Sequence, residues 1–287
     1  MESSPASYQI VTDLLAEHTG QHLTENRRWR IGTALSGVFR KHGISNVDQL
    51  VCLLDQPDRR KSDNDLAQEV VEALLNNETY FFRDKPTFDQ LPDDILPEIA
   101  RRRSDTKRIS IWSAGCSTGQ EVYSLAIAFA EQPARWDGWQ IDIFGTDVSN
   151  HAIAAARSGV YSQFEIQRGL GIAQMLKHFE ETGEGWQISN TTRMPTRFQQ
   201  HNVLSDPPSR QKFDLILCRN VLLYFDAKTR DIAFAKLHSA LAHDGFLMLG
   251  AGENTIGQSC DFSAVSGRAS VFQPYEPDQT YTRAVNG

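Results

Sequence analysis

A glycine-containing turn between a predicted strand and a predicted helix is the first part of this chain whose residues could do chemistry. The apolar segment 109–112 leads into Gly115 and Gly119, and the small side chains between these glycines let a ligand approach the backbone. Glu121 follows in the first helical turn, either as a partner of the helix dipole or as an acceptor for the cationic end of a cofactor. An α/β sheet binds nucleotide-like cofactors at such a junction, although the same turn also occurs without a cofactor.

An acidic residue, Asp147, ends the next predicted strand, at 141–147. Ligands of an open α/β sheet lie across the carboxyl ends of its strands, so Asp147 either accepts hydrogen bonds from both hydroxyls of a ribose or only caps a turn. The spacing from Gly115 to Asp147 exceeds the roughly 20 residues of the dinucleotide fingerprint, and neither GxGxxG nor GxxxxGK[ST] is present. NAD and ATP are therefore disfavoured. S-adenosylmethionine, which has ribose and adenine but no pyrophosphate, fits better.

Polar residues also follow the buried strand predicted at 213–218. Arg219 and Asn220 come directly after this strand, at the edge of the sheet where side chains can face a ligand cleft. Tyr224 follows one turn later. It either packs under the loop with its hydroxyl at the rim or takes part in a reaction.

A further group of polar residues lies upstream, in the segment 77–108. Asn77, Thr79 and Arg83 alternate there with aromatic residues and precede several prolines. The aromatic residues predict a segment packed between two domains. The interleaved polar residues indicate that the segment also presents Asn77, Thr79 and Arg83 at the surface of the larger domain.

Strands and helices alternate after residue 108. Apolar runs predict strands at 109–112, 141–147, 213–218 and 245–249, and helical spacing predicts helices at 122–130, 152–157 and 227–241. This order predicts an α/β fold with an open, mostly parallel, doubly wound sheet. The segment 186–203 departs from the order, and its alternating apolar residues predict a small antiparallel β insertion.

Apolar residues recur at helical spacing before residue 77, which predicts an all-helical amino-terminal domain of about four helices. The chain is then divided into a helical domain (1–76), a connector (77–108), a large domain (109–276) and a flexible tail (277–287).

Three basic residues stand out on the helix expected at 24–42. A rotation of about 100° per residue brings Arg27, Arg30 and Lys41 into one arc beside the apolar stripe. This basic arc is either a solvated helix face or a docking surface for an acidic helix of another protein.

Composition narrows the class of protein. The 287 residues are 40% hydrophobic and carry a formal net charge of −7, which disfavours nucleic-acid binding because that function needs a surplus of Lys and Arg. No apolar stretch comes close to the length of about 20 residues that a membrane-spanning helix needs. The four cysteines show no CxxC spacing, which predicts reduced thiols and no metal site. We therefore expect a cytoplasmic protein without direct membrane insertion.

Four separated blocks of this sequence resemble the CheR family of chemotaxis receptor methyltransferases. They are 77–84, 112–124, 145–147 and 218–226, and they occur in the order found in that family. The resemblance extends over nearly the whole chain. It implies a Rossmann-like class I methyltransferase that uses S-adenosylmethionine and methylates glutamate side chains on the cytoplasmic helices of chemoreceptors, giving glutamyl methyl esters.

The resemblance also implies roles for individual residues. Besides Gly115 of the glycine turn, the family's cofactor contacts fall on Asn77, Thr79, Arg83, Glu121, Asp147, Asn202, Val203, Arg219 and Asn220. Arg83 and Tyr224 match the residues that the family is thought to use to orient methyl donor and acceptor. The basic arc of Arg27, Arg30 and Lys41 resembles the positively charged helix that meets the receptor. Gln120 and Val122 depart from the usual Glu and Pro.

Other functions remain open at this stage. A cofactor-binding signalling adaptor that has lost catalysis would keep the same fold, and a methyltransferase for a small molecule would leave the helical domain without an obvious role. An oxidoreductase of the Rossmann type lacks its glycine spacing. One active site per chain is consistent with a monomer. The insertion has no clear glycine-rich loop, and this absence disfavours binding of a peptide at the receptor tail.

Overall fold

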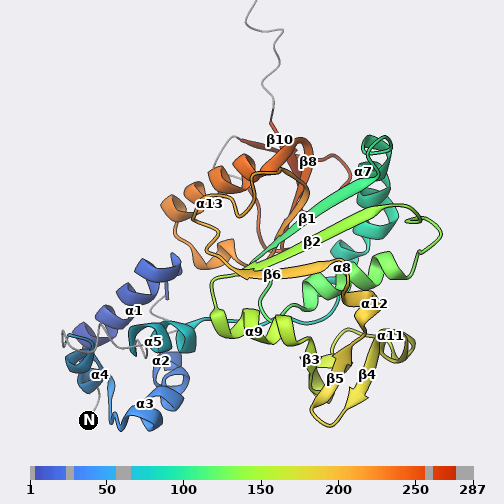
Figure 1. Ribbon diagram of the computed structural model, residues 1–287. Helices are drawn as coiled ribbons and strands as arrows, with labels where there is room; N and C mark the ends of the chain where they lie inside the picture. Colours follow the sequence, from blue (N-terminus) through green and yellow to red (C-terminus); the bar gives the residue numbers. More distant parts are fainter. Residues whose placement is uncertain (1–3, 24–28, 56–65, 256–260, 276–287) are drawn as a thin grey trace, which may run out of the picture.

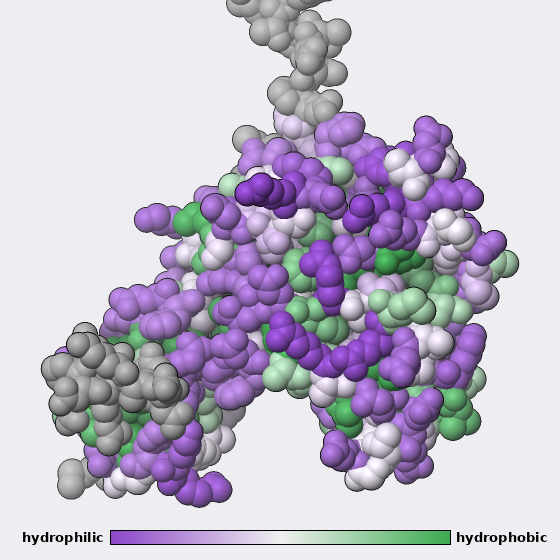
Figure 2. All heavy atoms as spheres, viewed as in Figure 1, coloured by the Kyte–Doolittle hydropathy of each residue, from purple (hydrophilic) through white to green (hydrophobic). Residues whose placement is uncertain are grey.

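The computed structural model describes residues 4–23, 29–55, 66–255 and 261–275 of the chain. These residues form a helical amino-terminal domain, a large α/β domain and a small three-stranded sheet (Figure 1). The space-filling view shows the helical domain and the small sheet as two projections with an indentation between them (Figure 2). The predicted tail at 277–287 lies outside the described residues.

The helical domain is held together by its own apolar core. Its described helices are α1 (Pro5–Thr19), α2 (Trp29–Ala34), α3 (Ser36–His42), α4 (Val47–Leu54) and α5 (Leu66–Leu74). Each contributes at least one buried apolar side chain to one cluster, and α1, α4 and α5 contribute several at helical spacing. The single helix predicted at 24–42 is wrong in its described part, because α2 and α3 are separated at Leu35; residues 24–28 lie outside the described ranges.

The main sheet of the described residues has seven strands in the order β6-β2-β1-β7-β8-β10-β9. They are β1 (Arg108–Ala114), β2 (Gln140–Asp147), β6 (Thr196–Gln200), β7 (Phe213–Cys218), β8 (Leu241–Leu249), β9 (Phe262–Ala264) and β10 (Val271–Pro274). The first five in chain order pair in parallel, and β10 and β9 are antiparallel. The predicted doubly wound α/β sheet is thus confirmed. Its strand order reverses between β1 and β7.

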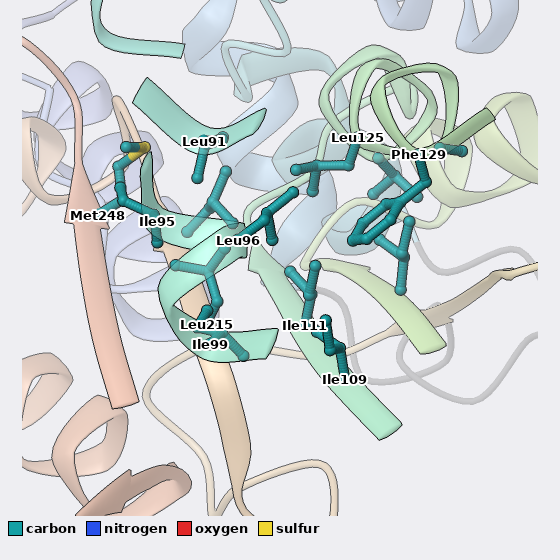
Figure 3. Close-up of a cluster of buried hydrophobic side chains, with 14 of the residues drawn as sticks. Leu91, Ile95, Leu96, Ile99, Ile109, Ile111, Leu125, Phe129, Leu215 and Met248 are labelled. Atoms are coloured by element: carbon teal, nitrogen blue, oxygen red, sulfur yellow. The ribbon is translucent and has the colours of Figure 1, made fainter. Parts of the chain in front are cut away.

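Helices cover both faces of this sheet. One face carries α7 (Leu96–Arg102), α8 (Gln120–Ala130) and α9 (Asn150–Ser158), and the other carries α13 (Ala227–Ala240) (Figure 1). Figure 3 shows side chains of α7 and α8 packed over the isoleucines of β1. Burial of these apolar side chains on both faces explains why the strands are continuously apolar in sequence.

The second half of the predicted connector packs on the sheet rather than linking two domains. It contains α6 (Lys85–Phe88), a π-helical turn (Leu91–Ile95) and α7. Arg268, between β9 and β10, pairs with Asp94 at 2.6 Å and with Glu98 at 2.5 Å. These ion pairs and the apolar core fix the segment against the large domain.

The antiparallel insertion lies earlier in the chain than predicted. Its strands β3 (Val160–Tyr161), β4 (Phe179–Thr182) and β5 (Gly185–Ile188) form a separate sheet in the order β3-β5-β4. Short helices accompany it: α10 (Gln163–Gln167), α11 (Ile172–His178) and α12 (Asn190–Arg193).

The prediction of an insertion at 186–203 is therefore wrong for most of that range. Residues Thr196–Gln200 are β6, which pairs in parallel with β2 at the edge of the main sheet. An edge strand leaves part of its surface in water, so its side chains alternate between half-buried and exposed. That alternation is the pattern the sequence shares with an antiparallel strand.

Candidate active site

A cleft lies beyond the carboxyl ends of β1, β2, β6 and β7, where the strand order reverses. This is the position at which open α/β sheets bind ligands. The cleft is partly open to solvent. It brings together all the residues predicted for the cofactor and the reaction: Asn77, Thr79, Arg83, Gly115, Glu121, Asp147, Asn202, Val203, Arg219, Asn220 and Tyr224.

The glycine turn after β1 depends on its glycines. Gly115 has a φ of +82° and Gly119 a φ of +94°. A Cβ atom on Gly115 would lie 2.3 Å from Val221 Cγ2, and one on Gly119 would lie 2.9 Å from the Cβ of Ala156. Both conformation and space therefore require glycine, and the backbone of the turn borders the cleft.

Asp147 at the end of β2 is buried but retains its hydrogen-bonding capacity. Its Oδ2 accepts from Ser117 N at 2.8 Å and its Oδ1 from Ser149 N at 2.9 Å. Burial raises the pKa of Asp147, and the backbone N–H donors act in the opposite direction. Each carboxylate oxygen has a second lone pair, so Asp147 caps its turn and still has acceptor sites for a ligand.

Arg219 and Glu121 form a buried ion pair in the cleft wall. Arg219 Nη1 donates to Glu121 Oε2 at 2.9 Å, and its Nη2 donates to the Arg83 carbonyl at 2.6 Å and to Asp84 Oδ2 at 3.3 Å. The other oxygen of Glu121 accepts from Ser113 Oγ at 2.7 Å. Glu121 therefore does more than face a helix dipole, because Arg219 joins it to the segment that carries Arg83.

Comparisons with known proteins identify the family to which this cleft belongs. Residues 77–271 match the family model described as CheR methyltransferase, SAM binding domain. The chain is 32% identical over 257 residues to chemotaxis protein methyltransferase 1 of Pseudomonas aeruginosa, covering 88% of this chain and 92% of that protein. It is 31% identical over 265 residues to the chemotaxis protein methyltransferase of Vibrio parahaemolyticus, covering 91% and 94%.

The chain belongs to the CheR methyltransferase family. It is accordingly a methyltransferase of the chemotaxis type that uses S-adenosylmethionine, and its sheet is the class I methyltransferase fold.

Two unpaired polar atoms indicate that the cleft of this CheR methyltransferase fits its cofactor. Arg219 Nε and Asn220 Oδ1 are buried and have no hydrogen-bond partner among the described residues. One is a donor and the other an acceptor, and both belong to residues that line the cleft. S-adenosylmethionine carries a carboxylate, an amino group, ribose hydroxyls and adenine nitrogens, so it can satisfy either kind of atom.

Asn220 itself is held in a left-handed conformation, with a φ of +60°. Its backbone N–H donates to Glu253 Oε2 at 2.7 Å, and Leu223 N donates to Glu253 Oε1 at 3.2 Å. Burial raises the pKa of Glu253. The sequence analysis missed this residue, which fixes the loop that carries Asn220 and Tyr224.

The helical domain supplies the opposite wall, through residues that the sequence analysis also missed. Thr19, Gln21 and Asn76 line the cleft. Asn76 Nδ2 donates a hydrogen bond to the Tyr224 hydroxyl, and His22 N donates to the Tyr224 carbonyl at 2.8 Å. The adjacent pair of asparagines after the last helix of the domain was the available signal for Asn76.

The basic arc is only partly described. Arg27 lies outside the described residues. Arg30 Nη2 approaches Asn76 Oδ1 at 3.5 Å, whereas Lys41 Nζ pairs with Glu69 Oε1 at 2.9 Å. Arg30 therefore lies beside a residue of the cleft wall, and Lys41, on α3, is paired with a residue of α5.

The cysteines carry no disulfide in the described part of the chain, where Cys52, Cys116 and Cys218 are free thiols; Cys260 lies outside it. Cys116 lines the cleft, but burial raises the pKa of its thiol well above the ordinary value, which disfavours the nucleophilic thiolate. No helix among the described residues is long and apolar enough to cross a bilayer, and no group of His, Cys, Asp and Glu side chains there could hold a metal ion.

Proposed function

We propose that this protein transfers a methyl group from S-adenosylmethionine to glutamate side chains on the cytoplasmic helices of chemoreceptors, forming glutamyl methyl esters. In this proposal it acts in the cytoplasm as a monomer. The names of its relatives in Pseudomonas aeruginosa and Vibrio parahaemolyticus, chemotaxis protein methyltransferases, support a substrate in chemotaxis. The choice of a carboxylate as methyl acceptor is supported by one observation, that the acidic side chains in the cleft are engaged in hydrogen bonds.

The carboxylates that line the cleft in the described part of the chain are all held by hydrogen bonds. Glu121 forms the ion pair described above, and Asp147 accepts two backbone N–H groups. Glu78 Oε1 accepts from Arg168 Nη2 at 2.9 Å. None of the three is poised as a general base. A glutamate acceptor needs none, because its ordinary pKa of about 4.3 leaves it ionised at neutral pH.

The protein's contribution to the reaction is then positioning and exclusion of water. Bound S-adenosylmethionine supplies a methyl group on a positively charged sulfonium sulfur. Opposite charges are neutralised during transfer to a carboxylate, so a cleft with little water favours the transition state. We assign Arg83, half-buried with Nη1 donating to the Glu78 carbonyl at 2.7 Å, to attraction of the incoming carboxylate. We assign Tyr224, which also lines the cleft, to the region where the methyl group would be transferred.

Replacement of Arg83 and Tyr224 tests these roles. We expect Arg83→Ala to lower kcat by about 10-fold or more and Tyr224→Phe by about 2- to 10-fold, the range for losing a charged and a neutral hydrogen bond. The dissociation constant for S-adenosylhomocysteine, measured by calorimetry, should change less than kcat. Arg83→Lys is the control that keeps the charge. An equal loss of turnover and cofactor affinity in both variants would assign the residues to cofactor binding alone.

Transfer of a labelled methyl group tests the whole proposal. The protein is incubated with labelled S-adenosylmethionine and a cytoplasmic receptor fragment, and the product is then exposed to mild alkali. We expect incorporation into the fragment that alkali releases, because carboxyl methyl esters hydrolyse there, and no incorporation when the receptor glutamates are replaced by alanine. Binding of S-adenosylhomocysteine without any transfer would instead indicate a signalling adaptor of the same fold.

We further propose that the basic arc docks the acidic receptor helix. The triple variant with Arg27, Arg30 and Lys41 changed to Glu should raise KM for the receptor and remove its dependence on salt, because exposed opposite charges attract over about one Debye length. A control with the same charge change places Glu at the exposed residues Arg101, Lys107 and Arg210, which lie outside the helical domain. Equal KM values for wild type and triple variant would show that the basic arc is only a solvated helix face and does not dock the receptor.

A further inference from the structure

A buried carboxylate of the helical domain reaches across to the large domain next to Asp147. The side chain of Glu72, on α5, is only 4% exposed. Its Oε2 accepts from Ser149 Oγ at 2.5 Å and its Oε1 accepts from Asn150 N at 2.7 Å. These contacts lie at the amino terminus of α9, where the helix dipole stabilises a negative charge. The contact therefore joins α5 of the helical domain to the start of α9 in the large domain.

Ser149 connects Glu72 directly to Asp147. Its hydroxyl donates to Glu72, and its backbone N–H donates to Asp147 Oδ1 at 2.9 Å. Ser149 is fully buried, and its Oγ also accepts from Ala152 N at 3.0 Å as the cap of α9. With both its polar groups engaged, Ser149 cannot move without disturbing one of the two carboxylates.

The arrangement also has an electrostatic consequence. The pKa of Asp147 is raised chiefly by burial, and the nearby charge of Glu72 raises it further. Burying two carboxylates against one serine costs desolvation free energy, which hydrogen bonds to each carboxylate must offset. An apolar contact would join the two domains without disturbing a residue of the cofactor cleft.

We propose that Glu72 is a positioning residue for the cofactor: through Ser149 it fixes the orientation of the Asp147 carboxylate, and it thereby makes cofactor affinity depend on the docking of the helical domain. This inference rests on the expectation that Asp147 accepts hydrogen bonds from the ribose of the cofactor, and not on the identity of the methyl acceptor. Glu72 does not line the cleft, so it acts only through its neighbours.

A double-mutant cycle on cofactor affinity tests the inference in the full chain. The dissociation constant for S-adenosylhomocysteine is measured by calorimetry for Glu72→Ala, Asp147→Asn and the double variant. We expect Glu72→Ala to weaken binding about 10-fold, as for the loss of one strong hydrogen-bonded contact. In the Asp147→Asn background the same replacement should change the constant by less than about 2-fold, because coupled residues are not additive.

Two further pairs of variants control for general destabilisation. Glu72→Gln should bind within about 3-fold of wild type, since an amide can still accept from Asn150 N and donate to Ser149 Oγ. Glu69→Gln, on the same helix but paired with Lys41 and His42, should have no effect. If Glu72→Ala does not fold, Ser149→Ala against Ser149→Thr makes the same comparison, with loss of affinity expected only for alanine.

The outcomes separate the inference from its premise. Unchanged affinity in Asp147→Asn would overturn the ribose contact and the role of Glu72 together. Weak binding in Asp147→Asn but normal binding in Glu72→Ala would overturn the role of Glu72 alone. Equal losses from Glu72→Ala in both backgrounds would make Glu72 a structural contact that does not act through Asp147, which also overturns the inference.

Discussion

The wall of the cleft built by the sheet and the wall built by the helical domain hold their polar groups in different ways. On the sheet side, Asp147 ends β2 and Arg219 follows β7, and the hydrogen-bond partners of their side chains belong to the large domain or its connector. On the helical side, Asn76 of the cleft wall donates across the interface to the Tyr224 hydroxyl, and nearby the His18 carbonyl accepts from Asn202 Nδ2. The first wall is built from the large domain and its connector, and the helical domain reaches it through Glu72 and Ser149. The second wall depends directly on how the two domains meet.

This difference separates two kinds of function. A group fixed by strand ends and buried ion pairs is preorganised before any ligand arrives, which suits the binding of a cofactor. A group held by a few interdomain hydrogen bonds can respond when a partner docks on the helical domain. Variants of the sheet wall should therefore change stability and cofactor affinity, and variants of the helical wall should change turnover.

The largest effect is expected for the ion pair of the sheet wall. Arg219→Ala leaves the carboxylate of Glu121 buried without its partner, and breaking a buried pair in this way typically costs about 3–5 kcal/mol of stability. Urea unfolding measures the change. Arg101→Ala, on an exposed side chain of α7, serves as control and should stay within about 0.5 kcal/mol of wild type. A stable Arg219→Ala protein would show that the sheet wall is not fixed by this pair.

The pH dependence of cofactor binding tests Asp147. Because burial raises its pKa, Asp147 takes up a proton at a higher pH than an ordinary aspartate, and a protonated carboxyl loses acceptor capacity. We expect affinity for S-adenosylhomocysteine to fall as the pH is lowered towards and through that raised pKa. Asp147→Asn should bind about 10-fold or more weakly at neutral pH and show no such acidic decline. The same decline in the variant would assign it to another group.

A smaller and different effect is expected for the helical wall. Asn76→Ala removes the hydrogen bond to the Tyr224 hydroxyl, a neutral contact of about 0.5–1.5 kcal/mol. Turnover should fall about 2- to 10-fold, with cofactor affinity and unfolding free energy near those of wild type. In a Tyr224→Phe background the replacement should add little, since the hydroxyl is already absent. A loss of cofactor affinity as large as that of Asp147→Asn would erase the distinction between the walls.

The smallest effect is expected outside the cleft, where Arg103 pairs with Asp244 at 2.6 Å beside the sheet. The hydrogen bond from Arg103 lowers the pKa of Asp244 from 3.8 to about 2. A lowered folded-state pKa gives stability that is present above the unfolded value and lost as the pH falls through the folded value. The stability difference between wild type and Asp244→Asn should therefore shrink between about pH 4 and pH 2, with turnover unchanged at neutral pH. A constant difference in acid unfolding would contradict the shift.

Much of the sheet wall could be predicted because buried strands are recognisable in the sequence. Buried parallel strands are continuous apolar runs, and their carboxyl ends share one edge, so Asp147 and Arg219 had to lie close together. The β6 strand was misassigned because an edge strand is only half buried. The helix predicted at 24–42 was too long because spacing alone does not show the break at Leu35.

The sequence by itself determined the fold class, the cofactor and the residues that follow the strands, because each depends on local patterns of burial and on short motifs. Only the tertiary structure decided the helical wall. Asn76 lies 148 positions from Tyr224, and Glu72 lies 77 positions from Ser149. No periodicity of the sequence links residues so far apart, because their contact is set by how the two domain surfaces pack. Polar groups that this packing buries must form hydrogen bonds with one another.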